Sequence, residues 1–323
     1  MCKALLFLFV IYRITIVLIL NAIYNFLMVQ KHDQRYKKIF SNPIFIEKLL
    51  VSFVNEKFIK DLDFTNMERL DKSFVDSKMK KRESDIIYKI NFKGKPIYIY
   101  LLLEFQSSVD QTMPLRFLRY ILELSESFGK DKDTKFYPAV FPLLLYNGED
   151  KWTAEINPKE LYSKTIPEKF IPSFEYYPII INKIEKKTLL KIHNVVSAIF
   201  FLENTSLNEM HKAFDDLIIL LKDSSPVEVN GFKVWLNSLL KDRNIDIDED
   251  KLQQLESPQE VLPMFAATLD KMEEEFTYKG KLEGKLEEKK EIAINLLKSS
   301  FGFENTSKIT GLTIDELKQL KLD

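Results

Sequence analysis

The sequence is poor in the residues on which several classes of protein depend. Its 323 residues include one cysteine, three histidines and 8 glycines. A single cysteine, Cys2, cannot form an internal disulfide framework, and with three scattered histidines it cannot build a cysteine-rich zinc site. This cysteine usage is typical of a reducing compartment, so we expect a cytoplasmic protein.

Several enzyme motifs are also absent. The nearest approach to a P-loop runs from Gly280 to Gly284-Lys285, but it is one residue too short and is followed by Leu286. Neither GxSxG nor HExxH occurs. Because 47 Lys and Arg oppose 48 Asp and Glu, for a net charge of -1, any contact with nucleic acid must come from a local basic patch.

What the chain has in quantity is apolar material. Hydrophobic residues make up 46% of it, so the chain must fold around at least one sizeable core. Residues 4–30 form one apolar run with Arg13 as the only charge, long enough to cross a bilayer. A secretory signal peptide fits poorly. Two interpretations of residues 1–27 stay open: a membrane anchor, or translation upstream of a true start at Met28.

The pattern then changes to that of an amphipathic soluble protein. Asn42 and Pro43 predict the cap and first turn of a helix over residues 44–54. The charged stretch 55–84, with a basic run at 78–82, predicts a solvated loop, and a phosphate-contacting patch is the alternative.

Residues 86–105 predict a β-hairpin, because two segments rich in β-branched and aromatic residues flank the turn signal Lys93-Gly94-Lys95-Pro96. A helix over 113–128 and a buried strand over 137–146 follow. We therefore expect a mixed α/β (α+β) domain over residues 28–182.

Beyond residue 183 the periodicity is helical only. Predicted helices cover 187–202, 207–222, 232–242 and 258–275, and the last continues through a charged segment to residue 299. We divide this part into a helical region at 183–275 and, at 276–323, a charged helix with a helix-turn-helix-like tail. Thr313 and Glu316 predict a capping box there, and Gly311 ends the preceding helix. Plain packing or oligomerisation is the alternative to DNA binding by this tail.

Two carboxylates meet if the hairpin is folded on paper. With the turn centred on Gly94-Lys95, Asp85 lies opposite Glu104. Because opposed like charges destabilise a sheet, a divalent cation such as Mg²⁺ would suit the pair. Gln106 shares a strand face with Glu104, and its amide could orient a water molecule. The alternative is two unrelated carboxylates at strand ends.

Four ordered blocks carry a family resemblance: HDQRYKKIF at 32–40, SDIIYKI at 84–90, PIYIYLLLEFQSSVDQTMPLRFLRYILEL at 96–124 and FPLLLYNG at 141–148. These blocks resemble the Rpn recombination-promoting nuclease and YhgA-like transposase family, part of the PD-(D/E)XK nuclease superfamily. A looser match extends to the tail. The resemblance implies a restriction-endonuclease-like core, with a central mixed sheet flanked by helices.

The resemblance also implies roles for particular residues. Asp85 and Glu104 would hold Mg²⁺, with Asp33 completing the site unless it is a helix cap. Gln106 stands where the superfamily more often has a lysine, so it supplies hydrogen bonds but no charge. The scissile phosphate would be held by Arg116, Arg119 and Tyr120; the alternative is a surface arginine pair over a packed tyrosine.

The function implied is a Mg²⁺-dependent DNA endonuclease, with Asp85, Glu104 and Gln106 as its catalytic residues and no small-molecule cofactor. A homodimer would suit the cutting of both strands. The alternative is a catalytically weak or inactive DNA-binding relative of a mobile element. We expect no ligand role for His32, His193 or His211.

Overall fold

The computed structural model describes residues 35–70, 85–93, 95–104, 109–129, 136–148, 150–206, 209–242, 245 and 247–320. At 85, 95–104, 211, 272, 273, 275, 276, 279 and 283 it describes the backbone alone. The apolar N-terminal run and the basic run at 78–82 lie outside the described residues. Among the helices that are described, none has both the length and the hydropathy needed to cross a bilayer.

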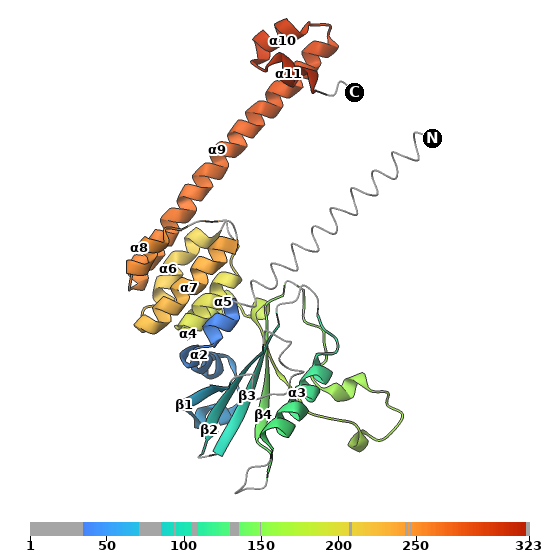
Figure 1. The fold of residues 1–323 in the computed structure, drawn as a ribbon, viewed down its shortest axis with the longest axis vertical. Helices are drawn as coiled ribbons and strands as arrows, with labels where there is room; N and C mark the ends of the chain where they lie inside the picture. The colour runs from blue at the N-terminus through green and yellow to red at the C-terminus, as the bar shows by residue number, and fades with distance from the viewer. Residues whose placement is uncertain are drawn as a thin grey trace. The chain divides into compact units, whose positions relative to one another are not determined.

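A five-stranded sheet organises the first compact unit, which ends at Met264. Its strands lie side by side in chain order: β1 (Leu62–Leu70), β2 (Asp85–Phe92), β3 (Lys95–Glu104), β4 (Ala139–Tyr146) and β5 (Tyr177–Ile180). β1, β2 and β3 pair antiparallel, whereas β3, β4 and β5 pair parallel. The helix α3 (Met113–Phe128) connects β3 to β4, as a parallel pair requires (Figure 1). The predicted mixed architecture is therefore confirmed.

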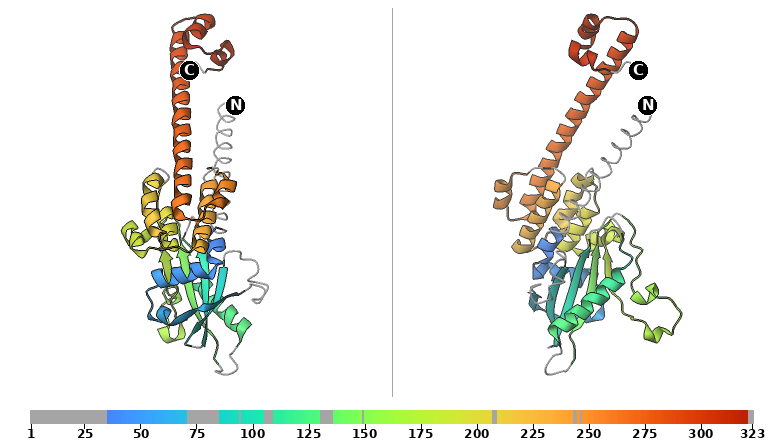
Figure 2. Two further views of the ribbon diagram at one scale, coloured as in Figure 1. Left: turned by 90° about the vertical axis from the view of Figure 1, so that its left-hand side faces the viewer. Right: turned by 45° about the vertical axis from the view of Figure 1, so that its right-hand side comes forward.

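Helices cover both faces of this sheet, as the views in Figure 2 show. One face packs against α3 through a cluster of buried side chains, namely Ile87, Met113, Phe117, Tyr120, Leu124, Leu144, Tyr146, Trp152, Ala154 and Tyr176. The other face lies against α2 (Pro43–Phe53) and the helical residues 35–40. There the hydroxyl of buried Tyr88 donates to the carbonyl oxygen of Phe40 at 2.7 Å. Ile87 and Tyr88 thus face opposite layers, as strand alternation demands.

Local sequence signals place the ends of these elements. The side chain of Asn42 accepts a hydrogen bond from the backbone N–H of Ile44 at 3.0 Å, and Pro43 occupies the first turn of α2, as predicted. The α3 helix has the predicted bounds and ends at Gly129, whose φ of +65° favours glycine.

The predicted loop at 55–84 is wrong for its first part. A short 3₁₀ helix, η1 (Lys57–Asp61), is followed by β1, which pairs with β2. The strand was hard to recognise because it is an edge strand with a bulge between Asp63 and Glu68 and has a single buried side chain, that of Leu62, so it lacks the alternation of a half-buried strand.

The region after residue 183 is helical throughout its described part. After η5 (Ile181–Lys183), its elements are α4 (Lys186–Ile192), α5 (Val195–Glu203), α6 (Met210–Leu220), α7 (Pro226–Asp242), α8 (Glu249–Gln254), α9 (Pro258–Lys298), α10 (Phe303–Thr310) and α11 (Ile314–Lys318). The single helix predicted over 187–202 is two helices. His193 has a left-handed φ of 52°, and Asn194 caps α5 in a reciprocal capping box with Ser197.

The two compact units of the structure divide between Met264 and Phe265, whereas the prediction places a boundary between residues 182 and 183. The helices α4 to α8 belong to the same compact unit as the sheet, and α5 packs on α2. The rings of Phe53 and Phe200 lie 4.9 Å apart, and Asn194 donates to the hydroxyl of Ser52 at 2.7 Å. The change at 183 is therefore a change of secondary structure within one unit.

The second compact unit begins at Phe265, within α9. The continuous helix predicted here is confirmed. A small core of Ala293, Leu312 and Leu317 holds the tail together. Both tail signals are confirmed, because Gly311 has a φ of +72° and Thr313 forms the capping box with Glu316.

A glycine permits the closest approach between α7 and α2. A Cβ added at Gly231 would collide with the ring of Phe45, which is 1% exposed. We predict that Gly231→Ala lowers the free energy of unfolding by about 1–3 kcal/mol, the usual cost of overpacking. Gly284→Ala is the control, because nothing lies within 4 Å of its Cβ position in α9. Thermal unfolding should show destabilisation by the first substitution alone, and equal melting temperatures for both variants would refute the close packing.

Candidate active site

The backbone places the two predicted metal ligands near each other at one end of the sheet. Asp85 begins β2 and Glu104 ends β3. The predicted register is wrong by two residues, since Asp85 pairs with Leu102 and not with Glu104. The reason is the turn, which leaves only Lys93 and Gly94 between the paired residues Phe92 and Lys95.

An error of two residues preserves the face of the sheet. Glu104 stands two positions beyond the partner of Asp85, so by strand alternation both positions lie on one face. That face is the one covered by α3, because Asp85 is two residues from Ile87 and Glu104 pairs with Tyr146. Diagonal residues of this kind lie about 7–8 Å apart, with their Cβ atoms somewhat closer, which is within reach of a shared cation.

The other predicted ligands cannot be placed. Asp33 and Gln106 lie outside the described residues, and the side chains of Asp85 and Glu104 are not described either. Within the described part of the chain, no three acidic, histidine or cysteine side chains gather in a way that could hold a metal ion. The roles of these four residues stay predictions.

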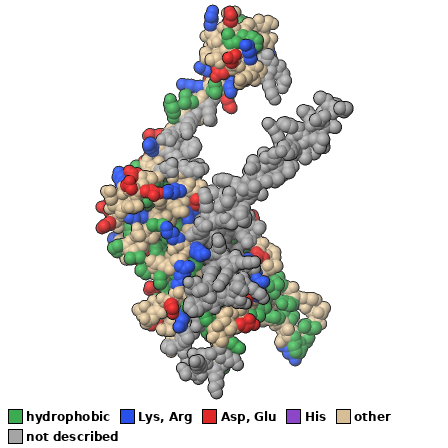
Figure 3. All heavy atoms as spheres, viewed as in Figure 1, with side chains coloured by type: hydrophobic (Ala, Val, Ile, Leu, Met, Phe, Trp, Pro, Cys, Tyr) green, Lys and Arg blue, Asp and Glu red, His purple; other side chains and the backbone are tan. Residues whose placement is uncertain are grey.

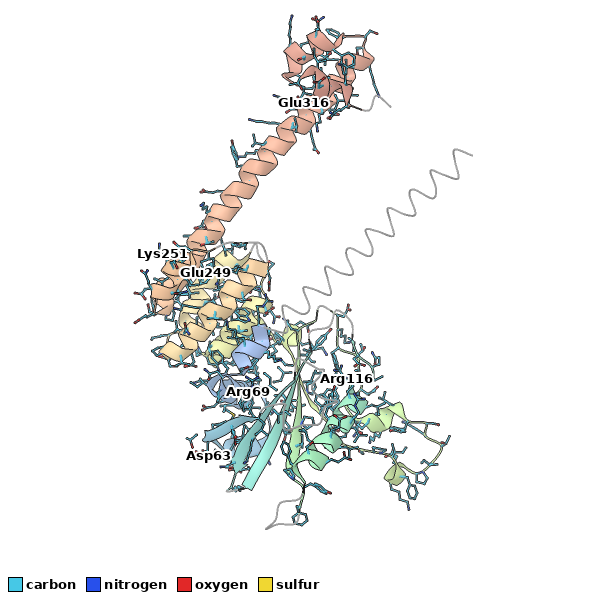
Figure 4. All side chains as sticks on the ribbon, in the orientation of Figure 1. Asp63, Arg69, Arg116, Glu249, Lys251 and Glu316 are labelled. Atoms are coloured by element: carbon cyan, nitrogen blue, oxygen red, sulfur yellow. The ribbon has the colours of Figure 1, made fainter. Side chains whose placement is uncertain are left out.

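Arg116 is fixed at the start of α3 by an acidic residue that sequence reasoning missed. Its Nη1 lies 2.9 Å from Oδ2 of Asp110, and both side chains are largely buried (Figure 4 labels Arg116). The other oxygen of Asp110 accepts hydrogen bonds from the backbone N–H and the hydroxyl of Thr112, at 2.8 and 2.6 Å. Asp110 therefore joins the first turn of the helix to the guanidinium. The Asp-x-Thr spacing before Pro114 was a signal for the contact of Asp110 with Thr112, though not for its pairing with Arg116.

The charge state of Asp110 reflects these contacts. Burial raises the pKa of this carboxyl, but the hydrogen bonds from Thr112 and Arg116 outweigh it, so the pKa is lower than usual. Asp110 is thus ionised at neutral pH and balances the charge of Arg116.

The other two predicted phosphate contacts differ in exposure. Arg119 is about half exposed, and its Nε lies 3.5 Å from Oε1 of Glu123 one turn along α3. Tyr120 is 1% exposed and belongs to the core cluster beneath α3. The burial of Tyr120 corresponds to the packed tyrosine of the alternative, whereas Arg116 is not a surface residue. The phosphate role of the three residues stays a prediction.

A second feature missed by sequence reasoning is the tight packing of Tyr146 beside the strand position of Glu104. Its ring lies 4.8 Å from that of Trp152, and its hydroxyl donates to the carbonyl oxygen of Asp150 at 3.0 Å. Any Cβ at Gly148 would collide with the Tyr146 ring. The Tyr-Asn-Gly sequence at 146–148 therefore allows the Tyr146 ring to pack closely at this end of the sheet.

A cavity of about 600 Å³ lies elsewhere, between the helical residues 35–40, α7 and α8. None of the predicted site residues whose side chains the structure describes lines it. Two of the cationic side chains that line the cavity are bonded to other groups of the protein. Arg35 pairs with Asp242, and Lys233 donates to the carbonyl oxygens of Leu252 and Leu255. His193 ends α4, and His32 and the side chain of His211 lie outside the described residues.

Comparison with known proteins places this arrangement in a family. The family described as "Putative transposase, YhgA-like" matches residues 30–229, more than half of the chain. The recombination-promoting nuclease RpnD of Escherichia coli O157:H7 is 27% identical over 158 residues, covering 44% of this chain and 59% of RpnD. RpnC of Escherichia coli strain K12, also named a recombination-promoting nuclease, is 33% identical over 78 residues, covering 24% of this chain and 25% of RpnC.

Another relative is named as inactive. The inactive recombination-promoting nuclease-like protein RpnE of Escherichia coli strain K12 is 25% identical over 147 residues, covering 43% of this chain and 49% of RpnE. The matches therefore span between 25% and 59% of these relatives' lengths. No solved structure matches the chain.

The Asp110–Arg116 pair can be tested through its pH dependence. Asp110→Asn keeps an oxygen that can accept from Thr112 but loses the charge, so we expect the free energy of unfolding to fall by about 1 kcal/mol at pH 7. A lowered pKa stabilises the folded state above the unfolded value near 4, and this contribution disappears as pH falls through the folded value. The difference in melting temperature between wild type and variant should therefore be constant above about pH 5 and shrink below about pH 4. Glu126→Gln, at an exposed position of α3, is the control; a pH-independent difference for Asp110→Asn would contradict the assignment.

Proposed function

Because this chain belongs to the YhgA-like transposase family, whose curated relatives include recombination-promoting nucleases, we propose that it is a Mg²⁺-dependent DNA endonuclease. The observation that carries the proposal is the placement of Asp85 and Glu104 at one end and on one face of the mixed sheet, beside the helix that bears Arg116. A central mixed sheet with α3 connecting β3 to β4 also supports a core of the PD-(D/E)XK type.

The donor set fits a hard divalent cation. Two carboxylates from adjacent strands, with Asp33 as a third candidate, offer the oxygen ligands that Mg²⁺ prefers, and the partial ligand set leaves room for water and phosphate. When bound, the ion would neutralise charge that develops on the phosphate during hydrolysis.

The remaining residues would bind and orient. Gln106, as an amide, would hold the attacking water by hydrogen bonds without taking its proton. Arg116 would face the phosphate with its orientation preset by Asp110, because a guanidinium held by a carboxylate loses less rotamer freedom on binding. Arg119 would bind a phosphate only by leaving its weak contact with Glu123.

One observation favours a second function. RpnE and a further relative, YjiP, are both named as inactive nuclease-like proteins. A site with Gln106 in place of a lysine lacks one positive charge near the reacting phosphate. The alternative is therefore a DNA-binding protein that keeps the fold with little or no cleavage.

A plasmid assay separates the two functions. With Mg²⁺ we expect the wild type to convert supercoiled DNA to nicked or linear forms, and Asp85→Ala to leave it intact because the metal site loses one of its few charged ligands. Glu68→Ala, which removes an exposed carboxylate of β1, should cut like wild type. Intact plasmid with the wild type, together with retention in a DNA-binding assay, would support the alternative function.

Two substitutions, one at the last residue of β3 and one just after it, separate metal binding from water orientation. Glu104→Ala should abolish both Mg²⁺ binding, measured by titration calorimetry, and cleavage. Gln106→Ala should bind Mg²⁺ normally but cut about ten- to a thousandfold more slowly, the range for loss of one transition-state hydrogen-bond donor. Undiminished cleavage by Glu104→Ala would show that the carboxylate pair is structural.

A further inference from the structure

The connection from β4 to β5 contains a long loop, residues 156–173, that is closed at its base. The side-chain amide of Asn157 donates to the hydroxyl of Ser173 at 3.1 Å, and its oxygen accepts from the backbone N–H of Lys159 at 3.0 Å. Just outside the loop, the indole N–H of Trp152 donates to the hydroxyl of Tyr176. That hydroxyl in turn donates to the carbonyl oxygen of Glu155. Compact loops of this length with joined ends are frequently functional.

The loop exposes apolar side chains, and its backbone is restricted in conformation. Two short 3₁₀ helices, η3 (Pro158–Leu161) and η4 (Glu168–Phe170), and three prolines restrict its conformation. Its exposed apolar residues are Ile156, Leu161, Tyr162, Ile166 (53% exposed) and Phe170 (66% exposed). Figure 3 shows green side chains gathered over this loop at the lower right of the molecule. A contiguous apolar surface of this kind marks an interaction site.

Lysines lie beside these apolar residues. Lys164 is 78% exposed, and the ammonium of Lys169 lies 5.0 Å from the centre of the Phe170 ring. Three lysines and two glutamates give residues 156–173 a net charge of +1. Because lysine is depleted at protein–protein interfaces whereas interfaces with DNA are strongly cationic, this composition favours DNA as the partner.

The base of the loop is attached to the helix of the candidate site. Tyr176 stacks on Phe117 of α3 with ring centres 4.9 Å apart, and Gln111 donates to the hydroxyl of Thr153 at 2.9 Å. The loop therefore extends from the same layer of the fold that carries Arg116. DNA held at the candidate site would lie against this layer.

We propose that residues 156–173 form a wedge that enters duplex DNA, with Ile166 and Phe170 inserted at a base step and Lys164 and Lys169 on the flanking phosphates. Apolar side chains that unstack a base step kink the duplex, and the cations compensate the phosphates brought to the protein surface. The inference rests on the proposed DNA endonuclease function and names the form of its substrate, a locally unstacked duplex.

Permanganate oxidation of unstacked thymines tests the wedge. Full-length protein is mixed with a duplex in EDTA, so that DNA stays intact whether or not the protein can cut it. The wild type should make a discrete set of thymines reactive. Ile166→Ser and Phe170→Ser should abolish that reactivity and weaken binding by about tenfold, the scale of one lost stacking contact. Ile219→Ser is the matched control, at 50% exposure on α6, and should behave like wild type.

The lysines are tested by the salt dependence of binding. Lys164→Gln should reduce the slope of log affinity against log salt by about 1. Lys187→Gln should leave the slope unchanged, because Lys187 is equally exposed (76%) and likewise paired with a glutamate. Unchanged reactivity and affinity in the loop variants, with wild-type cleavage intact, would overturn the wedge alone. Loss of self-association with unchanged DNA binding would also overturn it and identify a second copy as the partner. Absence of DNA binding by the wild type both in EDTA and in Mg²⁺ would overturn both proposals.

Discussion

The register between β2 and β3 is the constraint on which the candidate site depends. Phe92 pairs with Lys95, so two residues connect the strands, and every later pairing follows from that short turn. β3 is also the strand at which the sheet changes from antiparallel to parallel pairing. The start of β2 and the ends of β3 and β4 therefore lie at the same end of the sheet. Asp85, Glu104 and Tyr146 occupy these strand ends. A shift of one residue would move one carboxylate to the opposite face.

Much of this arrangement could be predicted from sequence because the signals are local. The hairpin, α3, the cap at Asn42 and the capping box at Thr313 each depend on residues a few positions apart. The edge strand β1 was missed because its identity comes from pairing with β2 and not from its own pattern. The break at His193 was missed for a different reason. The apolar periodicity continues through this position, although Asn194 caps a new helix there.

The sequence predicted where the candidate site residues lie on the sheet better than it predicted which side chains surround them. Alternation along a strand assigns Asp85 and Glu104 to a face even when the register is two residues wrong. No periodicity shows that Asp110 holds Arg116, because that contact depends on how the connection before α3 folds back on the helix. The burial of Tyr120 likewise depends on the Trp152 and Tyr176 region that packs beneath it, more than thirty residues later. Long-range packing therefore decides which polar residues of α3 remain accessible.

The close packing of Gly231 on Phe45 has a consequence for how such a chain can be rearranged during evolution. Since α2 belongs to the layers around the sheet and α7 to the helical region, a genetic exchange at residue 183 would separate two surfaces shaped for each other. An exchange within α9, between the buried residues Leu269 and Ala293, would keep together the tail's own cluster around Leu312. Breakpoints that preserve folding therefore fall inside the helix α9 and not in one of the loops where domains are usually joined. Inside a helix, an exchange must maintain both the reading frame and the helical phase.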